Sequence, residues 1–144
     1  MPKRVLAAGL ALLALSVAAC SSSSPETIRG CVIEPGTKCV DADLSYTNLR
    51  GTNLRSADLS KADLSYANPS YANLRSADLS NADLSYTNLR RTNLRGANLT
   101  DADLSYTNLS DADLTGADLT GADLYAANLR GANLTDVIGL PPRR

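Results

Sequence analysis

Between residues 42 and 135, hydrophobic and polar positions repeat every five residues. Nineteen consecutive units read [Ala/Thr]-[Asp/Asn]-Leu-x-x, from the unit centred on Leu44 to the unit centred on Leu134, and Pro69 is the only substitute for leucine. A helix turns by about 100° per residue, so leucines at this spacing would circle it without forming an apolar face. A long flat strand would send alternate leucines to opposite faces. The pattern therefore predicts a short extended piece and then a corner in each unit, with Ala/Thr and Leu pointing inward.

A second period, of twenty residues, indicates how many units complete one coil. The residue before each leucine sorts by chemistry into four rows, which we call the four sides. The first side carries Asp43, Asp63, Asp83, Asp103 and Asp123, and the second Asn48, Asn68, Asn88, Asn108 and Asn128. The third carries Asn53, Asn73, Asn93, Asp113 and Asn133, and the fourth Lys38, Asp58, Asp78, Asn98 and Asp118. Duplication of a twenty-residue block would leave the same trace. We interpret the sorting as four sides per coil, with like residues stacked between coils.

These units resemble the pentapeptide-repeat proteins, a family whose fold is a right-handed, four-sided parallel β-helix. The resemblance covers residues 37–136 if residues 37–41 count as a degenerate first unit with Cys39 in the leucine slot. It implies an all-β, right-handed quadrilateral solenoid of about five coils of four pentapeptides. At the ~4.8 Å spacing of adjacent strands the shaft would be roughly 24 Å long. Pro69 removes one ladder donor, which predicts either a local defect or a bend that shapes a surface.

The open ends of a solenoid are sheet edges that need covering. Residues 31–39 predict an N-terminal cap hairpin, with two short strands around a Pro35–Gly36 turn. Residues 137–144 predict a C-terminal cap and tail, in which residues 137–140 supply apolar cover and Pro141–Pro142 prevents further pairing.

The first thirty residues predict export and a lipid anchor. Residues 1–19 have the features of a signal peptide, with Lys3 and Arg4 before the apolar run of residues 5–15. Residues 17–20 then read Val-Ala-Ala-Cys, which resembles the bacterial lipobox and implies that Cys20 is lipidated and becomes the mature N-terminus. An ordinary cleaved signal peptide with an incidental cysteine is the alternative. Residues 20–30 would then form the lipidated, flexible tether.

The remaining cysteines, Cys31 and Cys39, would meet in an oxidising compartment, where we expect a disulfide between the cap and the first coil. The alternative is a free, buried Cys39 in the leucine slot. The chain has no His and no C-x-x-C pair, so neither a metal site nor a cofactor is expected. Without the signal segment the chain has 12 basic and 15 acidic residues, a net charge of −3.

Three surfaces are candidates for binding. Tyr46, Tyr66, Tyr86 and Tyr106 recur every twenty residues, with Tyr71 nearby, and could form a platform for a sugar chain or a peptide. Neighbouring rings could instead simply cover one another. The row Asp43, Asp63, Asp83 and Asp103 could hold divalent cations, although solvation relieves such repulsion in most proteins. The arginines of the second and third sides could bind anionic headgroups or glycans, or stay solvated.

The carboxylates stand in repeated rows on convex sides, and nothing distinguishes one copy from the next, so we expect no catalytic residue and no enzyme. The leading hypothesis is a lipid-anchored, monomeric scaffold or interaction protein of the bacterial envelope, facing outward from the cytoplasm. It would lie in the outer membrane if the cell has two membranes. Its partner would be an unknown envelope protein or a polysaccharide.

Two alternative functions remain. One is glycan or peptidoglycan binding along the tyrosine side. The other is a DNA-mimicking protector of type II topoisomerases, as some family members are. The export signal, the short shaft and the arginine rows disfavour the second alternative, and we expect no nucleic-acid partner.

Overall fold

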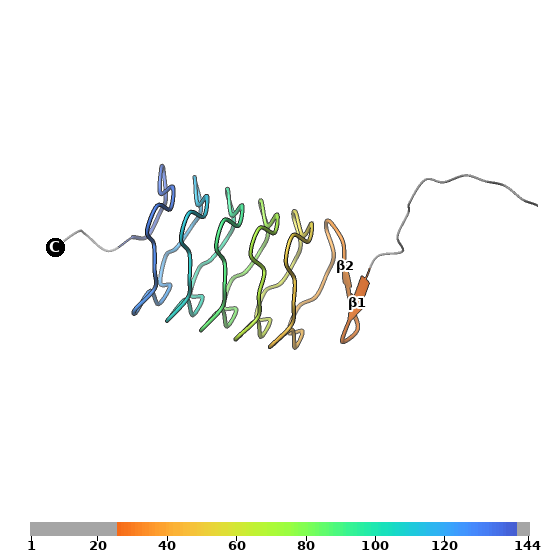
Figure 1. Ribbon diagram of the computed structural model, residues 1–144. Helices are drawn as coiled ribbons and strands as arrows, with labels where there is room; N and C mark the ends of the chain where they lie inside the picture. The colour runs from red at the N-terminus through yellow and green to blue at the C-terminus, as the bar shows by residue number, and fades with distance from the viewer. Residues whose placement is uncertain (1–25, 141–144) are drawn as a thin grey trace, which may run out of the picture.

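The computed structural model describes residues 26–140, which form a hairpin followed by a regular solenoid (Figure 1). Strand β1 (Glu26–Ile28) pairs antiparallel with β2 (Cys31–Ile33), and the chain reverses at Arg29–Gly30. Both turn residues have positive φ, 47° and 82°, which is the combination of a two-residue type I′ hairpin. The predicted signal segment, Cys20 and residues 141–144 lie outside the described residues.

The predicted position of the cap hairpin is wrong, because its turn is Arg29–Gly30 and not Pro35–Gly36. In the structure, the Thr37 N–H donates to the Glu34 carbonyl across Pro35–Gly36. Pro35 suits the second position of a type II turn, and Gly36, with φ 72°, suits the third. This dipeptide therefore forms a corner like those of the repeats and leads the chain into the first coil.

Along the solenoid, the residue before the leucine slot pairs in parallel with the residue twenty places later, from Lys38↔Asp58 to Asp118↔Ile138, with one exception after Asn68. The Leu44 N–H donates to the Asp63 carbonyl at 2.7 Å, and the Asp63 N–H donates back to the Ala42 carbonyl at 2.9 Å. The same two bonds recur in successive units. The predicted period of twenty residues per coil is confirmed, and Figure 1 shows the coils stacked along one axis.

Each side ends in a tight turn. In the first, the Thr47 N–H donates to the Leu44 carbonyl, and Tyr46, the third residue of the turn, has φ 57°. A positive φ at the third residue alone is the signature of a type II turn. Glycine fills this position in some units, but a side chain occupies it in most, at a cost of about 1 kcal/mol or more. The Tyr46 N–H donates to the Ser65 carbonyl of the next coil at 3.0 Å, which helps to hold the strained residue.

The Asp or Asn before each leucine has a structural role that the sequence pattern alone did not explain. In all nineteen units its Oδ1 accepts a hydrogen bond from the N–H two residues later. Asp and Asn are the side chains that reach their own backbone in this way. Side-chain bonds between the asparagines of successive coils are longer: Asn128 and Asn108 each donate Nδ2 to Oδ1 of the Asn of the coil before, at 3.4 and 3.5 Å.

The interior is built of leucines and small residues. The leucines from Leu44 to Leu119 are at most 2 % exposed, and most of the paired alanines are equally buried. Within the nineteen regular units three buried threonines take the alanine position, and their hydroxyls donate to carbonyls of the coil before, as from Thr87 to Leu64 at 2.8 Å. Among the described residues no buried side-chain polar atom lacks a partner. Threonine can therefore replace alanine without an unsatisfied hydroxyl.

Pro69 is buried in the leucine slot of the second side, between Leu49 and Leu89. Its neighbour Asn68 pairs with Asn48 of the coil before, but the pairing with Asn88 of the coil after is absent from an otherwise regular ladder in the described part of the chain. The physical reason is that proline has no N–H to donate to the Asn88 carbonyl. The defect is local, because both flanking coils keep the regular ladder.

The two ends differ. At the N-terminal end the β1–β2 hairpin lies against the first coil, where Cys31 and Ile33 join the core. At the C-terminal end Ile138 continues the ladder by pairing with Asp118 and is 58 % exposed. The predicted apolar cover by residues 137–140 is therefore wrong for Ile138, and the leucines of the last coil stay partly exposed: Leu124, Leu129 and Leu134. No helix within residues 26–140 is long and apolar enough to cross a membrane.

Candidate binding surfaces

The four predicted tyrosines lie in register at the corner between the first and second sides. Successive ring centroids from Tyr46 to Tyr106 are 4.8–4.9 Å apart, and the ring planes are within 1–4° of parallel. Tyr125 closes the far end of this stack edge-on, at 5.5 Å and 78°. Each inner ring therefore covers the faces of its neighbours. Within the stack only the outer face of Tyr46 stays open, and Tyr46 is 72 % exposed against 47–49 % for the other three.

The aspartates of the first side also lie in register, one per coil. Asp43 and Asp63 each accept from the Ser two residues later through both its N–H and its hydroxyl, and Asp83 accepts the Ser85 N–H. The hydroxyl and N–H of Ser45, together with the Arg29 guanidinium, lower the pKa of Asp43. On the fourth side, the hydroxyl and N–H of Thr120 lower the pKa of Asp118. Both carboxylates are thus held ionised as acceptors, which does not suit a general acid.

The aspartate row does not gather into a cation site in the structure. Within residues 26–140, no group of three His, Cys, Asp or Glu side chains could hold a metal ion. The reason is geometric, because each Oδ1 is already turned back toward its own corner.

A different cluster forms at the corner between the second and third sides. Here successive coils present unlike residues: Gly51, Tyr71, Arg91, Asp111 and Gly131. The Arg50 guanidinium carbon lies 4.9 Å from the Tyr71 ring centroid, and that of Arg91 lies 5.8 Å from it. Arg91 also donates Nη1 to the Tyr71 hydroxyl at 3.4 Å. One arginine comes from the coil before Tyr71 and the other from the coil after it, so the ring orders two cations.

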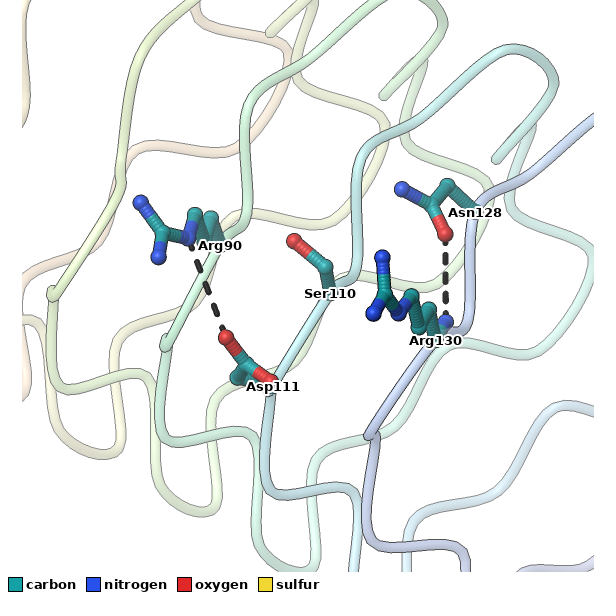
Figure 2. Close-up of a pocket in the computed structure, with 5 residues that line it drawn as sticks. All are labelled: Arg90, Ser110, Asp111, Asn128 and Arg130. Carbon is teal, nitrogen blue, oxygen red and sulfur yellow. Dashed lines mark hydrogen bonds and ion pairs between the residues drawn. The ribbon is translucent and has the colours of Figure 1, made fainter.

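Next to this cluster lies a polar depression of about 370 Å³ (Figure 2). It is bounded by Arg90 and Arg130, which flank Ser110 on the coil between them, and Asp111 and Asn128 complete its lining. The short Ser110 side chain between two long ones leaves the space. Asp111 lies 3.8 Å from Arg90 Nε and 3.6 Å from Arg91 Nε, and these pairs are about half-exposed.

Charge is distributed by side over the whole shaft. The Asp rows lie on the first and fourth sides, whereas the second and third sides and the corner between them carry seven arginines: Arg50, Arg55, Arg75, Arg90, Arg91, Arg95 and Arg130. Asp113, on the third side, pairs with Arg95 at 3.2 Å. Burial raises the pKa of Asp113, but hydrogen bonds from Thr115 and Arg95 outweigh it and lower the pKa overall. The shaft thus has acidic sides and a basic edge.

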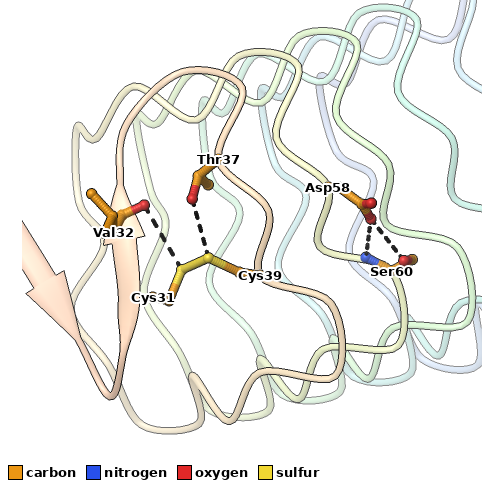
Figure 3. Close-up of a disulfide and its surroundings, with 6 residues drawn as sticks. All are labelled: Cys31, Val32, Thr37, Cys39, Asp58 and Ser60. Carbon is orange, nitrogen blue, oxygen red and sulfur yellow. Dashed lines mark hydrogen bonds between the residues drawn. A yellow bond between two sulfur atoms is a disulfide. The ribbon is translucent and has the colours of Figure 1, made fainter.

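The structure also joins Cys31 and Cys39, with an S–S distance of 2.01 Å and Cα atoms 5.5 Å apart (Figure 3). Cys31 lies on β2 and Cys39 on the first coil, so the bond ties the cap to the shaft. The sequence interpretation placed Tyr71 only near the tyrosine row and missed its contacts with Arg50 and Arg91. The sequence does contain the information needed to predict these contacts. When the chain is aligned in coils of twenty residues, the three residues fall on neighbouring coils at the same corner.

Comparison of the sequence with models of known protein families finds one match. The model for pentapeptide repeats matches in eight copies, over residues 37–68, 72–105 and 97–136. A search of curated proteins finds no match.

Solved structures of pentapeptide-repeat proteins are similar to this chain. One is alr5209 from Nostoc PCC 7120, at 40 % identity over 67 % of this chain and 83 % of its own, with a TM-score of 0.58. Another is Rfr23 from the cyanobacterium Cyanothece 51142, at 30 % identity over 72 % of this chain and 91 % of its own, with a TM-score of 0.48. HetL, from Nostoc sp. strain PCC 7120 and involved in heterocyst differentiation regulation, is 36 % identical. That match covers 74 % of this chain and 59 % of HetL, with a TM-score of 0.43.

The family model covers well over half of the chain, and the twenty-residue ladder, the type II corners and the buried leucine column account for each position of the repeat. The chain therefore belongs to the pentapeptide-repeat family, whose fold is the right-handed quadrilateral β-helix.

Proposed function

We propose that the chain is a non-catalytic, lipid-anchored interaction protein of the bacterial envelope, whose shaft presents chemically distinct sides to its partners. The observation that carries this proposal is the concentration of aspartates on the first and fourth sides of a regular ladder and of arginines on the second and third. Because the Asp and Asn side chains bond to their own corners and the corner N–H groups bond to the next coil, the sides are rigid. Rigid, preorganised side chains lose less entropy when a partner binds.

The anchor is proposed from the sequence alone. Cys20 follows Val-Ala-Ala at the end of the signal segment, and β1 begins at Glu26. Six residues span at most about 20 Å when fully extended. A lipid on Cys20 would therefore keep the shaft close to the membrane surface, within reach of envelope polymers and membrane proteins.

Fractionation of cells that express the full chain tests this function. Cys20→Ala should move the protein from the membrane fraction to the soluble fraction of the envelope or to the medium. Ser21→Ala is the matched control, since it changes the adjacent residue and keeps the acceptor thiol, and it should stay with the membrane. Membrane retention of Cys20→Ala in 1 M salt would contradict the lipid anchor.

The two alternative functions gain less support. Sugar stacking on the tyrosine row needs open ring faces, and the stack from Tyr46 to Tyr106 closes them. A DNA mimic needs a rod with acidic charge on the sides that a DNA-binding protein would grip, whereas Arg50, Arg90 and Arg130 line one side of this shaft.

A further inference from the structure

We propose that the second side of the shaft binds an acidic polysaccharide that carries one carboxylate per disaccharide. The binding surface is the arginine edge, which we define as Arg50, Arg90, Ser110 and Arg130 together with Arg91 and Asp111 at the adjoining corner. This proposal deepens the proposed function by naming the class of partner, and it rests on that function for the place where the two would meet.

Spacing is the first argument. Along the second side the residue after the leucine slot alternates between arginine and serine: Arg50, Ser70, Arg90, Ser110 and Arg130. Adjacent coils are about 4.8 Å apart, so the three guanidinium stems recur about every 9.6 Å along a straight line. Two pyranose rings of an extended polysaccharide cover nearly the same length. One carboxylate per disaccharide therefore meets successive arginines without a change of register. Between Arg90 and Arg130 the neutral ring lies over Ser110, whereas Ser70, between Arg50 and Arg90, is buried and makes no contact with the ligand.

Shape is the second argument. The depression of about 370 Å³ lies between Arg90 and Arg130, where Ser110 leaves room. Figure 2 shows the Arg130 guanidinium extending toward Ser110 and the Ser110 hydroxyl pointing to the other side, toward Arg90. A carboxylate can accept two parallel N–H bonds from a guanidinium. The serine hydroxyl supplies a donor and an acceptor for the hydroxyls of the neighbouring neutral ring.

Preorganisation is the third argument. Arg50 lies over the Tyr71 ring, and Asp111 holds the Nε groups of Arg90 and Arg91 at 3.8 and 3.6 Å. These contacts restrict side chains that are otherwise among the most mobile on a protein surface. Because the Nε groups are the ones engaged by Asp111, the terminal nitrogens of Arg90 and Arg91 can bind a ligand without breaking the pair. Part of the cost of ordering Arg50, Arg90 and Arg91 has thus been met before binding.

Asp111 also discriminates between ligands. It places one negative charge beside the depression, on the coil between Arg90 and Arg130 and turned toward Arg90 (Figure 2). A polymer with a carboxylate on every ring, or a dense anionic bilayer, would bring negative charge against Asp111. A polymer with a carboxylate on alternate rings places a neutral ring there. Repulsion of the wrong partner is a common source of specificity.

A lipid bilayer is the main competing partner. It can be distinguished from a polysaccharide chain by which arginines each of them would contact. Lipid headgroups form a continuous surface, so a bilayer would engage Arg55 and Arg75 of the third side as strongly as the arginine edge. A single polysaccharide chain on the second side would not. Arg55 and Arg75 occupy the same position in their units as Arg90 and Arg130, so their removal is a matched control for charge and fold.

Isothermal titration of the purified full chain tests the proposal, with hyaluronan oligosaccharides as the alternate-ring probe and polygalacturonate as the every-ring probe. Wild type should bind hyaluronan more tightly than polygalacturonate, should ignore neutral dextran, and should bind less tightly as salt is raised. Arg90→Gln with Arg130→Gln should weaken hyaluronan binding by at least about tenfold, since both carboxylate partners are lost. Arg55→Gln with Arg75→Gln should change it by less than about twofold, within the range of screened surface charges.

A further variant tests the role of Asp111. Asp111→Asn keeps a residue that tolerates positive φ at this corner and removes the negative charge. It should tighten the binding of polygalacturonate more than that of hyaluronan. An unchanged preference would overturn the discrimination that we assign to Asp111.

Three results would overturn the proposal as a whole. The first is no hyaluronan binding by wild type at low salt. The second is an equal loss of hyaluronan binding in the two arginine pairs, which would indicate diffuse electrostatic attraction. The third is that wild type binds vesicles containing phosphatidylglycerol more tightly than hyaluronan, with equal losses in both pairs, which would indicate a bilayer. Circular dichroism and thermal melting of each variant exclude unfolding as the cause. If wild type does not bind hyaluronan but Cys20→Ala is released from the membrane, the proposed ligand class is wrong and the proposed lipid-anchored function is still supported.

Discussion

The substitution Pro69→Leu tests the ladder at the position where it is broken. Leucine at this position restores the repeat and supplies an N–H that can donate to the Asn88 carbonyl, as the Leu89 N–H donates to Asn108 at 2.8 Å. The slot is buried between Leu49 and Leu89, both 0 % exposed, so the new side chain stacks in a continuous leucine column. We expect Pro69→Leu to stabilise the protein.

The magnitude follows from three terms. A backbone hydrogen bond contributes about 1 kcal/mol net. Leucine buries one more carbon atom than proline, worth about 0.8 kcal/mol. Proline restricts the unfolded chain, and losing that restriction costs about 0.4–1 kcal/mol. The free energy of unfolding should therefore rise by about 1 kcal/mol, which corresponds to roughly 4 °C in the melting temperature of a domain of this size.

Chemical denaturation followed by circular dichroism measures the change, and a reverse substitution on the same side controls it. Leu109→Pro removes the bond from the Leu109 N–H to the Asn128 carbonyl, now 2.9 Å, and should lower the free energy of unfolding by about 2 kcal/mol or more. A Pro69→Leu variant that is less stable than wild type would refute this reasoning. It would mean that the slot has closed around the proline ring and cannot accept leucine.

Three further outcomes are expected. Stability should fall as pH drops below about 4, because three carboxyls have folded-state pKa values below their ordinary 3.8 and must be protonated at a cost, namely Asp43, Asp113 and Asp118; equal melting temperatures at pH 7 and pH 2.5 would contradict this. Tyr86→Gly should be more stable than Tyr86→Ala by about 1 kcal/mol in urea denaturation, because φ at this corner is 56° and glycine adopts it without strain; the opposite order would argue against the type II corner. Reduction of Cys31–Cys39 should lower the free energy of unfolding by about 2–3 kcal/mol, read as the difference in melting with and without dithiothreitol, and an unchanged melt would show that the bond is not formed.

The tyrosine row illustrates how far the repeat carries the interpretation. Its twenty-residue spacing predicts that Tyr66 lies over Tyr46, and the stacked rings confirm it. The spacing does not say whether the ring faces stay open. That depends on the side-chain conformations, which bring the ring planes to within 1–4° of parallel. Neighbouring rings therefore cover one another's faces. A surface that the sequence left as a possible sugar platform is, in the structure, a stack that stiffens one corner.

The N-terminal cap illustrates where the interpretation failed. Pro35–Gly36 and Arg29–Gly30 are both good turn sequences, and local preference alone does not rank them as hairpin turns. The choice depends on pairing, because β1 at residues 26–28 lies outside the segment that the sequence marked as a cap. Which strand pairs with β2 is a tertiary question, so the local signal could not answer it.

By itself, the sequence determined the coil, because a strict five-residue pattern has one way to bury every leucine and its Ala or Thr partner. It also determined which side chains share a side, since twenty residues close one turn. Only the tertiary structure decided what those side chains do there. The Asp and Asn oxygens turn back to their own corners, Tyr71 orders Arg50 and Arg91 from two different coils, and Ser110 leaves a depression between two arginines. The reason is that the burial of a periodic core depends on spacing alone, whereas contacts at the surface depend on which rotamers neighbouring coils allow.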